Sequence, residues 1–549
     1  MTSKKALTAV LLAGVSVMAF GSTALAAKPA SNGTSEPVAT STSATDEKIK
    51  ELQDQVQGLS DQIVDLKRST GDQYTDVQNQ QASLVKVSLA NGRPTFSSAD
   101  GQFTAAIRAL VQFDWAYYSQ GSGAKSLPAA YGPDLSSGSN FRRVYLGLQG
   151  KLFGDWSYNL NLDFGGSSGT ETPGHVQSIY LQYDGFAPWA FRVGAYPPPA
   201  NIEDGTSSPD TIFLERNSPS NLQRGLAGGD GRDAVTVLYA GERLFGAISY
   251  TGGKTQDAAV FDEQQAFLGR ASYLLVNDSD THLLVGANAT HIFKLPDAVP
   301  NGTAVLGTTP GATALSSISL ADPPELTVDS GGLRLANTGS LPANHLTQWG
   351  LEAAGNYQSV YAQGGYYSFG VDRAPVAYKT YTSATTSGTT IFQPSNNTFS
   401  GWYAQLAWTL TGEERTYNAA NGAFSPPKPT TSVGHGGWGA WELAARFSDL
   451  NLNSHALDST ALITNWTGAS TQTYTFANTV RGGNQRIFTA GLNWYVSTAI
   501  RFAFDYQYID VSRLQSPATV TISSGTPTLG TLNGGQTANT FAVRAQFSL

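Results

Sequence analysis

Residues 487–511 alternate between apolar and polar side chains with a period of two. The alternation is interrupted near the middle by Ser497 and Thr498. Because successive side chains of a strand point to opposite faces, the pattern predicts a β-hairpin with one apolar and one polar surface. The strand lengths fit tilted membrane-crossing strands, and aromatic residues lie near the ends of the apolar faces. We therefore expect the apolar face to meet lipid and the polar face to line a water-filled lumen.

The same alternation recurs from Gln102 to the end of the chain. It predicts sixteen strands, and bacterial single-chain barrels have an even number. The predicted strands lie near residues 102–119, 140–152, 156–164, 175–183, 191–196, 234–240, 245–251, 266–276, 281–293, 345–357, 360–369, 400–411, 440–450, 487–496, 500–511 and 540–549. The predicted fold class is all-β: a sixteen-stranded antiparallel transmembrane β-barrel, preceded by a short N-terminal coiled-coil helix.

The connections between these strands alternate in length. Those after the second, fourth, sixth, eighth, tenth and fourteenth strands are short, whereas those after odd strands are mostly long and rich in Gly, Ser, Thr, Asn and Pro. Long outer loops opposite short periplasmic turns are typical of an outer-membrane barrel, and a soluble β-sandwich has no reason to show them. The exception is the inner-side connection 412–439, which is long.

The first residues follow other patterns. Lys4 and Lys5 precede an apolar run that ends in small residues, which predicts a removed export signal peptide over residues 1–26. An uncleaved membrane anchor is the alternative. Residues 27–45 are rich in Ser, Thr and Pro and predict a linker.

Residues 46–68 predict a coiled-coil segment, because their apolar positions are spaced alternately by three and four residues. The seam consists of Ile49, Leu52, Val56, Leu59, Ile63 and Leu66. A lone amphipathic helix is the alternative. The seam favours two strands, whereas barrel contacts would favour three, so the number stays open. We expect a weaker helix to about residue 90, the barrel domain over residues 91–549, and the coiled coil in the periplasm.

Composition narrows the classes of function. Charged residues make up 13% of the 549 residues, about half the usual share. The mean hydropathy of −0.20 and the lack of a later apolar run of about 18 residues exclude a helical membrane protein. The net charge of −8 disfavours nucleic acid as a partner. The chain has no cysteine and its six histidines are scattered, so we expect no metal site and no cofactor.

Several segments resemble the phosphate-selective porin O and P family of bacterial outer-membrane porins. They are 141–166, which begins FRRVYLGLQGKLFGDW; 408–426, which begins WTLTGEERTYN; and 439–452 and 491–506. Segment 194–219, GAYPPPANIEDGTSSPDTIFLERNSP, is similar to the third loop of that family, which folds into the barrel and narrows it. The resemblance implies a homotrimeric outer-membrane channel that lies in lipid and passes small solutes, phosphate and other anions among them. It does not imply an enzyme.

Strand parity predicts which arginines face the lumen. They are Arg108, Arg143, Arg192, Arg270, Arg446, Arg501 and Arg544. Arg142 has outward parity, so an inward role requires a β-bulge, while the resemblance places both Arg142 and Arg143 in the arginine ladder of the family. Guanidinium groups bind oxyanions through paired hydrogen bonds, and rings of cations favour anions in a pore. The alternative is that these arginines pair with inward carboxylates and only hold the wall open.

The resemblance also implies a constriction loop that carries Glu203, Asp204, Asp210, Glu215 and Arg216. Residues 196–220 contain no lysine and are net acidic. We therefore expect a porin with only a weak preference for anions. A local pair between Glu215 and Arg216 would turn some of this acidity away from the pore.

Two other functions fit parts of the sequence. Residues 165–169, GGSSG, match the G-x-S-x-G pattern that a lipid hydrolase would use, but that pattern needs an α/β sheet and here lies between β-strands. The coiled coil and the long loops near 295–343 and 371–398 fit a structural or adhesive role. The channel accounts for more of the chain and is the preferred interpretation.

Overall fold

The computed structural model describes residues 42–83, 85–89, 92–120, 134–166, 173–257, 262–297, 316–467, 471–514, 520–522 and 535–549. The chain divides into two units, Met1–Gln80 and Gln81–Leu549. The predicted signal peptide, and the predicted linker as far as residue 41, lie outside the described residues.

The first unit holds one long helix, α1 (Thr42–Ser83). It begins within the predicted linker and continues through the stretch where a weaker helix was expected, since Gln-rich sequence retains good helix propensity. The seam side chains are exposed in a single chain; Leu66, for example, is 67% exposed. Coiled-coil pairing therefore stays a prediction. None of the helices that the structure describes has the length and apolar character needed to cross a bilayer.

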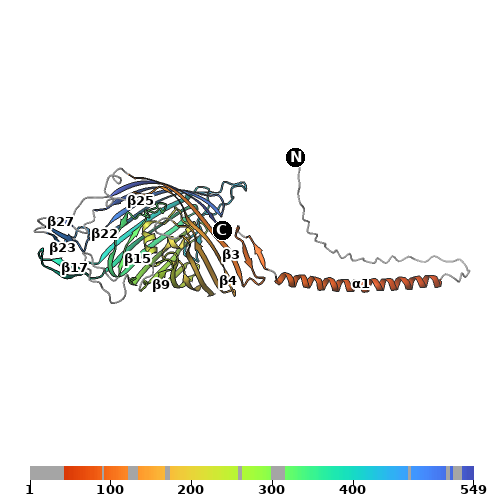
Figure 1. Ribbon diagram of the computed structural model, residues 1–549. Coiled ribbons are helices and arrows are strands. Elements are labelled where there is room, and N and C mark those ends of the chain that lie inside the picture. Colours follow the sequence, from red (N-terminus) through yellow and green to blue (C-terminus); the bar gives the residue numbers. More distant parts are fainter. Residues whose placement is uncertain are drawn as a thin grey trace. The chain divides into compact units, whose positions relative to one another are not determined.

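The second unit is a closed antiparallel barrel of sixteen strands, which confirms the predicted fold class (Figure 1). Its strands in chain order are β3 (Thr104–Gln120), β4 (Gly138–Leu152), β5 (Trp156–Asp163), β6 (His175–Phe186), β7 (Trp189–Ala195), β8 (Arg232–Ala240), β9 (Leu244–Lys254), β10 (Gln265–Asn277), β11 (Thr281–Lys294), β15 (Leu341–Tyr357), β16 (Val360–Arg373), β19 (Asn397–Thr409), β22 (Ala440–Ser454), β25 (Val480–Tyr495), β26 (Ile500–Ser512) and β28 (Gln536–Ser548). The last strand pairs with the first, with Arg544 opposite Asp114, so the ring has no free edge.

The two faces of the wall differ as the alternation predicts. On β3, Trp115 and Tyr117 are about half exposed on the outside, whereas Gln112 and Asp114 are buried on the inside. Aromatic rings also pair across neighbouring strands on the outside, as Trp441 and Trp494 do with their centroids 5.2 Å apart. An apolar exterior with aromatic rings suits a bilayer.

Short strands besides the sixteen were not predicted, because two or three residues are too few to show an alternation or because the strands lie in long connections. They are β1 (Lys86–Ser88), β2 (Thr95–Ser97), β12 (Ser317–Ile318), β13 (Ala321–Asp322), β14 (Ala336–Asn337), β17 (Val376–Tyr381), β18 (Ser387–Phe392), β20 (Tyr417–Asn418), β21 (Ala423–Phe424), β23 (Leu462–Thr467), β24 (Thr471–Thr475) and β27 (Val520–Ile522). Part of the interior is itself an apolar core. There Leu222 and Leu226 of the loop after β7 belong to the same buried cluster as inward-facing Tyr367 and Phe399.

Candidate channel constriction

The connection between β7 and β8 enters the barrel as a structured loop. Pro197 follows Ala195 closely and cannot donate to a strand ladder, so β7 ends there. The loop then forms α3 (Ile202–Gly205), η2 (Ser208–Asp210) and α4 (Ser218–Ala227). Asparagine caps both α-helices: the Asn201 side chain accepts from the Asp204 N–H and the Asn217 side chain from the Ser220 N–H. The sequence thus specifies short helical turns where a mobile loop would otherwise hang in the lumen.

This constriction loop, residues 196–231, is fastened to the far wall through its backbone. The Leu214 N–H donates to Asp505 on β26 at 2.9 Å, and the Ile202 N–H donates to Glu352 on β15 at 2.9 Å. Arg501 donates to the carbonyl oxygens of Thr211 and Ile212 at 2.6 and 2.7 Å. Inward polar residues of the wall therefore hold the loop rather than face open water.

Glu215 is the main side-chain anchor of the loop. Its carboxylate lies 2.8 Å from Arg142, 3.4 Å from Arg143 and 2.9 Å from Arg544. Burial by itself would raise the pKa of Glu215, but these guanidinium groups hold the pKa well below its usual range. Glu215 pairs with the wall and not with its neighbour Arg216.

Two adjacent arginines can both reach Glu215 because β4 carries a β-bulge. Gln112 of β3 faces Arg143, and the next residue, Phe113, faces Phe141, so Arg142 is the extra residue. Both arginine side chains are buried on the inside of the wall. Strand parity alone would point Arg142 outward, and the bulge turns its side chain inward, as that reading required.

The other acidic residues of the loop also have partners. Glu203 accepts from Gln363 and Gln405 of the wall at 2.8 and 2.9 Å. Asp204 is bound by Arg224 of α4 and lies 4.0 Å from Arg216. Burial raises the pKa of Asp210 in η2, although the positive charge of Arg501 opposes the rise. The net acidity read from the loop sequence is therefore largely neutralised by residues that the loop meets after folding.

A second loop, residues 316–340 between β11 and β15, covers the constriction loop from the side of the long connections. Its Glu325 accepts from Arg446 at 2.6 Å and from the Ser218 N–H at the start of α4 at 2.9 Å. Asp322 accepts from Asn221 at 2.6 Å, and burial raises the pKa of the Asp322 carboxyl well above its usual range. The alternation of loop lengths predicted an outer loop here, and it did not predict that the loop turns inward onto α4.

The long inner connection 412–439 closes in from the other end. Its Arg415 forms a buried pair with Glu442 at 2.8 Å, and the carbonyls of Asn421 and Gly422 accept from Arg270. Gly422 has a φ of 55°, and a Cβ there would lie 2.7 Å from the Phe245 ring, so only glycine fits. The exception to the loop-length pattern is thus a structured part of the lumen.

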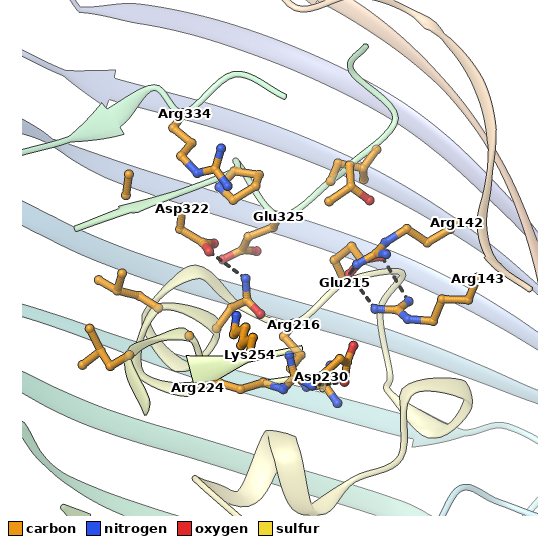
Figure 2. Close-up of a pocket in the computed structure, with 18 of the residues that line it drawn as sticks. Arg142, Arg143, Glu215, Arg216, Arg224, Asp230, Lys254, Asp322, Glu325 and Arg334 are labelled. Atoms are coloured by element: carbon orange, nitrogen blue, oxygen red, sulfur yellow. Dashed lines mark hydrogen bonds and ion pairs between the residues drawn. The ribbon is translucent and has the colours of Figure 1, made fainter. Parts of the chain in front are cut away.

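Two cavities remain between these loops and the wall. The outer one, about 280 Å³, is lined by Arg142, Arg143, Arg216, Arg224, Lys254 and Arg334 against the carboxylates of Glu215, Asp230, Asp322 and Glu325 (Figure 2). The inner one, about 220 Å³, is lined by Arg108, Arg192, Arg216 and Arg224 against Asp204 and Asp230. Both cavities include Arg216, Arg224 and Asp230, so they meet at these three residues.

The eight arginines named from the sequence fall into two groups. Arg142, Arg143, Arg270, Arg446 and Arg544 contact carboxylates, and Arg501 is bound to loop carbonyls. Arg108 and Arg192 have no carboxylate within 4 Å among the residues that the structure describes. Arg108 donates to Gln149 at 3.4 Å and Arg192 to Gln182 at 2.6 Å. The wall arginines are thus divided between anchors, which bind carboxylates or loop carbonyls, and two cations of the inner cavity, Arg108 and Arg192, that have no carboxylate partner among the described residues.

Comparison with known proteins decides the family. The family model described as "Phosphate-selective porin O and P" matches residues 126–526, which is most of the chain. The chain belongs to this family. Porin O of Pseudomonas aeruginosa is 25% identical to this porin over 375 residues, which cover 67% of this chain and 75% of that protein. An uncharacterized protein of Caulobacter vibrioides is 25% identical over 427 residues, covering 76% and 71%.

Among solved structures, this porin is similar to OmpT, an outer-membrane protein of Vibrio cholerae. The TM-score is 0.41 at 10% identity, and the match covers 81% of this chain and 99% of that one. Family membership makes the protein an outer-membrane porin channel. The G-x-S-x-G match lies partly outside the described residues.

Several residues of this porin that line the outer cavity were not predicted from the sequence, among them Lys254, Arg224, Asp230, Arg334 and Glu325. Lys254 is the last residue of β9, and its ammonium group has no ion-pair partner among the described residues. Glu325 could have been predicted from the segment Asp322-Pro-Pro-Glu325, which places two carboxylates around two prolines in a loop otherwise poor in charge. Lys254 gave no such signal, because strand-end lysines are common.

Proposed function

We propose that this porin prefers anions to cations, and phosphate-type oxyanions in particular. The observation that carries the proposal is the charge of the two cavities: six cationic side chains against four carboxylates in the outer one, and four against two in the inner one, among the described residues. A cationic excess in a narrow passage with low-dielectric walls attracts anions. The constriction loop has no lysine in residues 196–220, but Lys254 of the wall adds one to the lining of the outer cavity.

The cations that act on a solute are those without a carboxylate partner. Among the described residues of the outer cavity these are Lys254 and Arg334; the Arg334 guanidinium donates to the Gly332 carbonyl at 3.2 Å. In the inner cavity they are Arg108 and Arg192. We assign the paired arginines a different part of the same function: Arg142, Arg143 and Arg544 add positive potential while they hold the loop in place.

Replacing Lys254 with glutamine should lower the chloride-to-potassium permeability ratio about fivefold. One unit charge about 8 Å from the ion path shifts the energy of each ion by about 0.5 kcal/mol at an effective dielectric constant of about 80. The shift has opposite signs for chloride and potassium, so their ratio changes by about 1 kcal/mol. The measurement is the reversal potential in planar bilayers under a KCl gradient. Lys151→Gln is the matched control, because Lys151 is exposed on β4 and lines neither cavity. Clear cation selectivity of the unaltered channel would refute the proposed preference.

We also propose that the porin assembles as a homotrimer with α1 in the periplasm. The exposed apolar seam of α1 supports an association between copies through this helix. Deleting residues 46–68 should leave single-channel conductance unchanged and weaken the oligomer to heat. Conductance in bilayers and the migration of unheated samples in detergent gels measure the two effects. Loss of all pore activity would contradict the assignment of α1 as an assembly element.

A further inference from the structure

The inner cavity contains a guanidinium group, that of Arg192, which is held in place but still has nitrogens available to bind a solute. Arg192 on β7 lies directly across from Gln182 on β6, to which its Nε donates at 2.6 Å. The guanidinium lies over the ring of Tyr180 at 4.4 Å and over that of Tyr196 at 5.2 Å. Stacking and this one hydrogen bond restrain the side chain, while its terminal nitrogens have no acceptor among the described residues. The guanidinium group can therefore donate these terminal N–H groups to an acceptor on a solute.

A second observation comes from Tyr145 on β4, which also lines this cavity. Its side chain is 6% exposed, and its hydroxyl has no hydrogen-bond partner among the described residues. A buried hydroxyl without a partner is costly, so its place in a cavity wall indicates that something in the cavity bonds to it. Ser178 lines the same space, and its hydroxyl, which donates to Asn159 at 2.7 Å, can still accept a hydrogen bond.

The rest of the lining separates this cavity from a simple oxyanion site. Pro197 and Pro199 form an apolar wall beside the arginines, while the Tyr196 ring is fully buried and has the Arg192 guanidinium over it. An inorganic phosphate ion gains nothing from such a wall. A ring with C–H faces does gain from it, and its hydroxyls would meet Tyr145 and Ser178. The two carboxylates present, Asp204 and Asp230, are both bound by Arg224.

We infer that the inner cavity binds an organic anion with a hydroxylated ring, such as a sugar phosphate or a sugar acid. The anionic group lies on Arg192 and Arg108, and the ring packs on the wall formed by Pro197 and Pro199. The cavity volume of about 220 Å³ is just below the range of roughly 300–1,000 Å³ for small-molecule sites, so the ligand is of monosaccharide size. This inference rests on the proposed anion preference and names the class of solute within it.

The test compares glucose 6-phosphate, inorganic phosphate and glucose as blockers of KCl current through the full-length porin in planar bilayers. Glucose 6-phosphate should half-block the current at a concentration at least about fivefold below that of phosphate, and glucose should not block. Tyr145→Phe should weaken block by glucose 6-phosphate about fivefold, the effect of one lost hydrogen bond, and leave block by phosphate unchanged. Arg192→Gln should weaken block by both anions. Tyr508→Phe, which removes a hydroxyl from the outer face of the wall, is the control.

Equal block by glucose 6-phosphate and phosphate would overturn the inference, and so would a Tyr145→Phe channel with unaltered block. The reversal potential of the same membranes reports the anion preference separately. An anion-selective channel without preferential block refutes this inference alone, whereas a cation-selective channel refutes the proposed function.

Discussion

Glu215→Gln should loosen the constriction loop and strengthen the anion preference of the channel. The substitution removes the charge that three guanidinium groups share: those of Arg142 and Arg143, which Figure 2 shows beside Glu215, and that of Arg544. Removing one partner from a buried ion pair costs about 3–5 kcal/mol, because the remaining charge is left uncompensated. Freed guanidinium groups would also add positive potential to the outer cavity. We expect larger current noise, a more anion-selective reversal potential, and trypsin cleavage after Arg216.

The pH dependence of the unaltered channel tests the same ion pairs. The pKa of Glu215 in the folded protein lies below its ordinary value of 4.5. Its stabilising contribution is therefore complete above pH 4.5 and is lost only as the pH falls through the lower, folded value. Conductance noise should stay constant from pH 7 to about pH 5.

For the Glu215→Gln substitution, Glu242→Gln in an exposed turn is the control. A Glu215→Gln channel with unchanged noise and trypsin resistance would disprove the anchoring role.

Arg446→Met should release the second loop, residues 316–340. The side chains of Arg446 and Glu325 are 1% and 0% exposed, and the two groups lie 2.6 Å apart. Methionine keeps much of the packing over Phe213, where the guanidinium lies 4.4 Å from the ring centroid, but leaves Glu325 as a buried charge. The expected cost is about 3–5 kcal/mol. The loop should then become open to trypsin at Arg334, and single-channel conductance should rise.

A second substitution shows whether the effect of Arg446→Met comes from the unpaired charge of Glu325 or from the change of side-chain shape. Combining Arg446→Met with Glu325→Gln removes both charges, so the double variant should recover much of the lost trypsin resistance. Arg486→Met is the matched control: Arg486 is 54% exposed and pairs with Asp449 at the surface, where an ion pair contributes at most about 1 kcal/mol. If the single and double variants were equally sensitive to trypsin, the buried pair would not hold the loop.

The acidity of the constriction loop shows the limit of reading charge from sequence. Within residues 196–220 the count of carboxylates predicted a loop unfavourable to anions. In the folded protein Glu215 meets arginines of β4 and β28, Glu203 meets wall amides, and Asp204 meets Arg224. The charge that a solute meets is the charge left after these contacts, and the partners come from distant parts of the chain.

The sequence by itself determined the sixteen strands and the face on which the wall side chains lie wherever the strands are regular, which excludes Arg142 at its β-bulge. Both follow from two-residue periodicity, which is a local property of a pleated backbone beside lipid on one side and water on the other. Only the tertiary structure decided how deep each arginine lies, which loops turn inward, and which cations keep no carboxylate partner. These features depend on pairs such as Arg544 and Asp114, which are 430 positions apart and meet only when the ring closes. Periodicity carries no information about such distances along the chain.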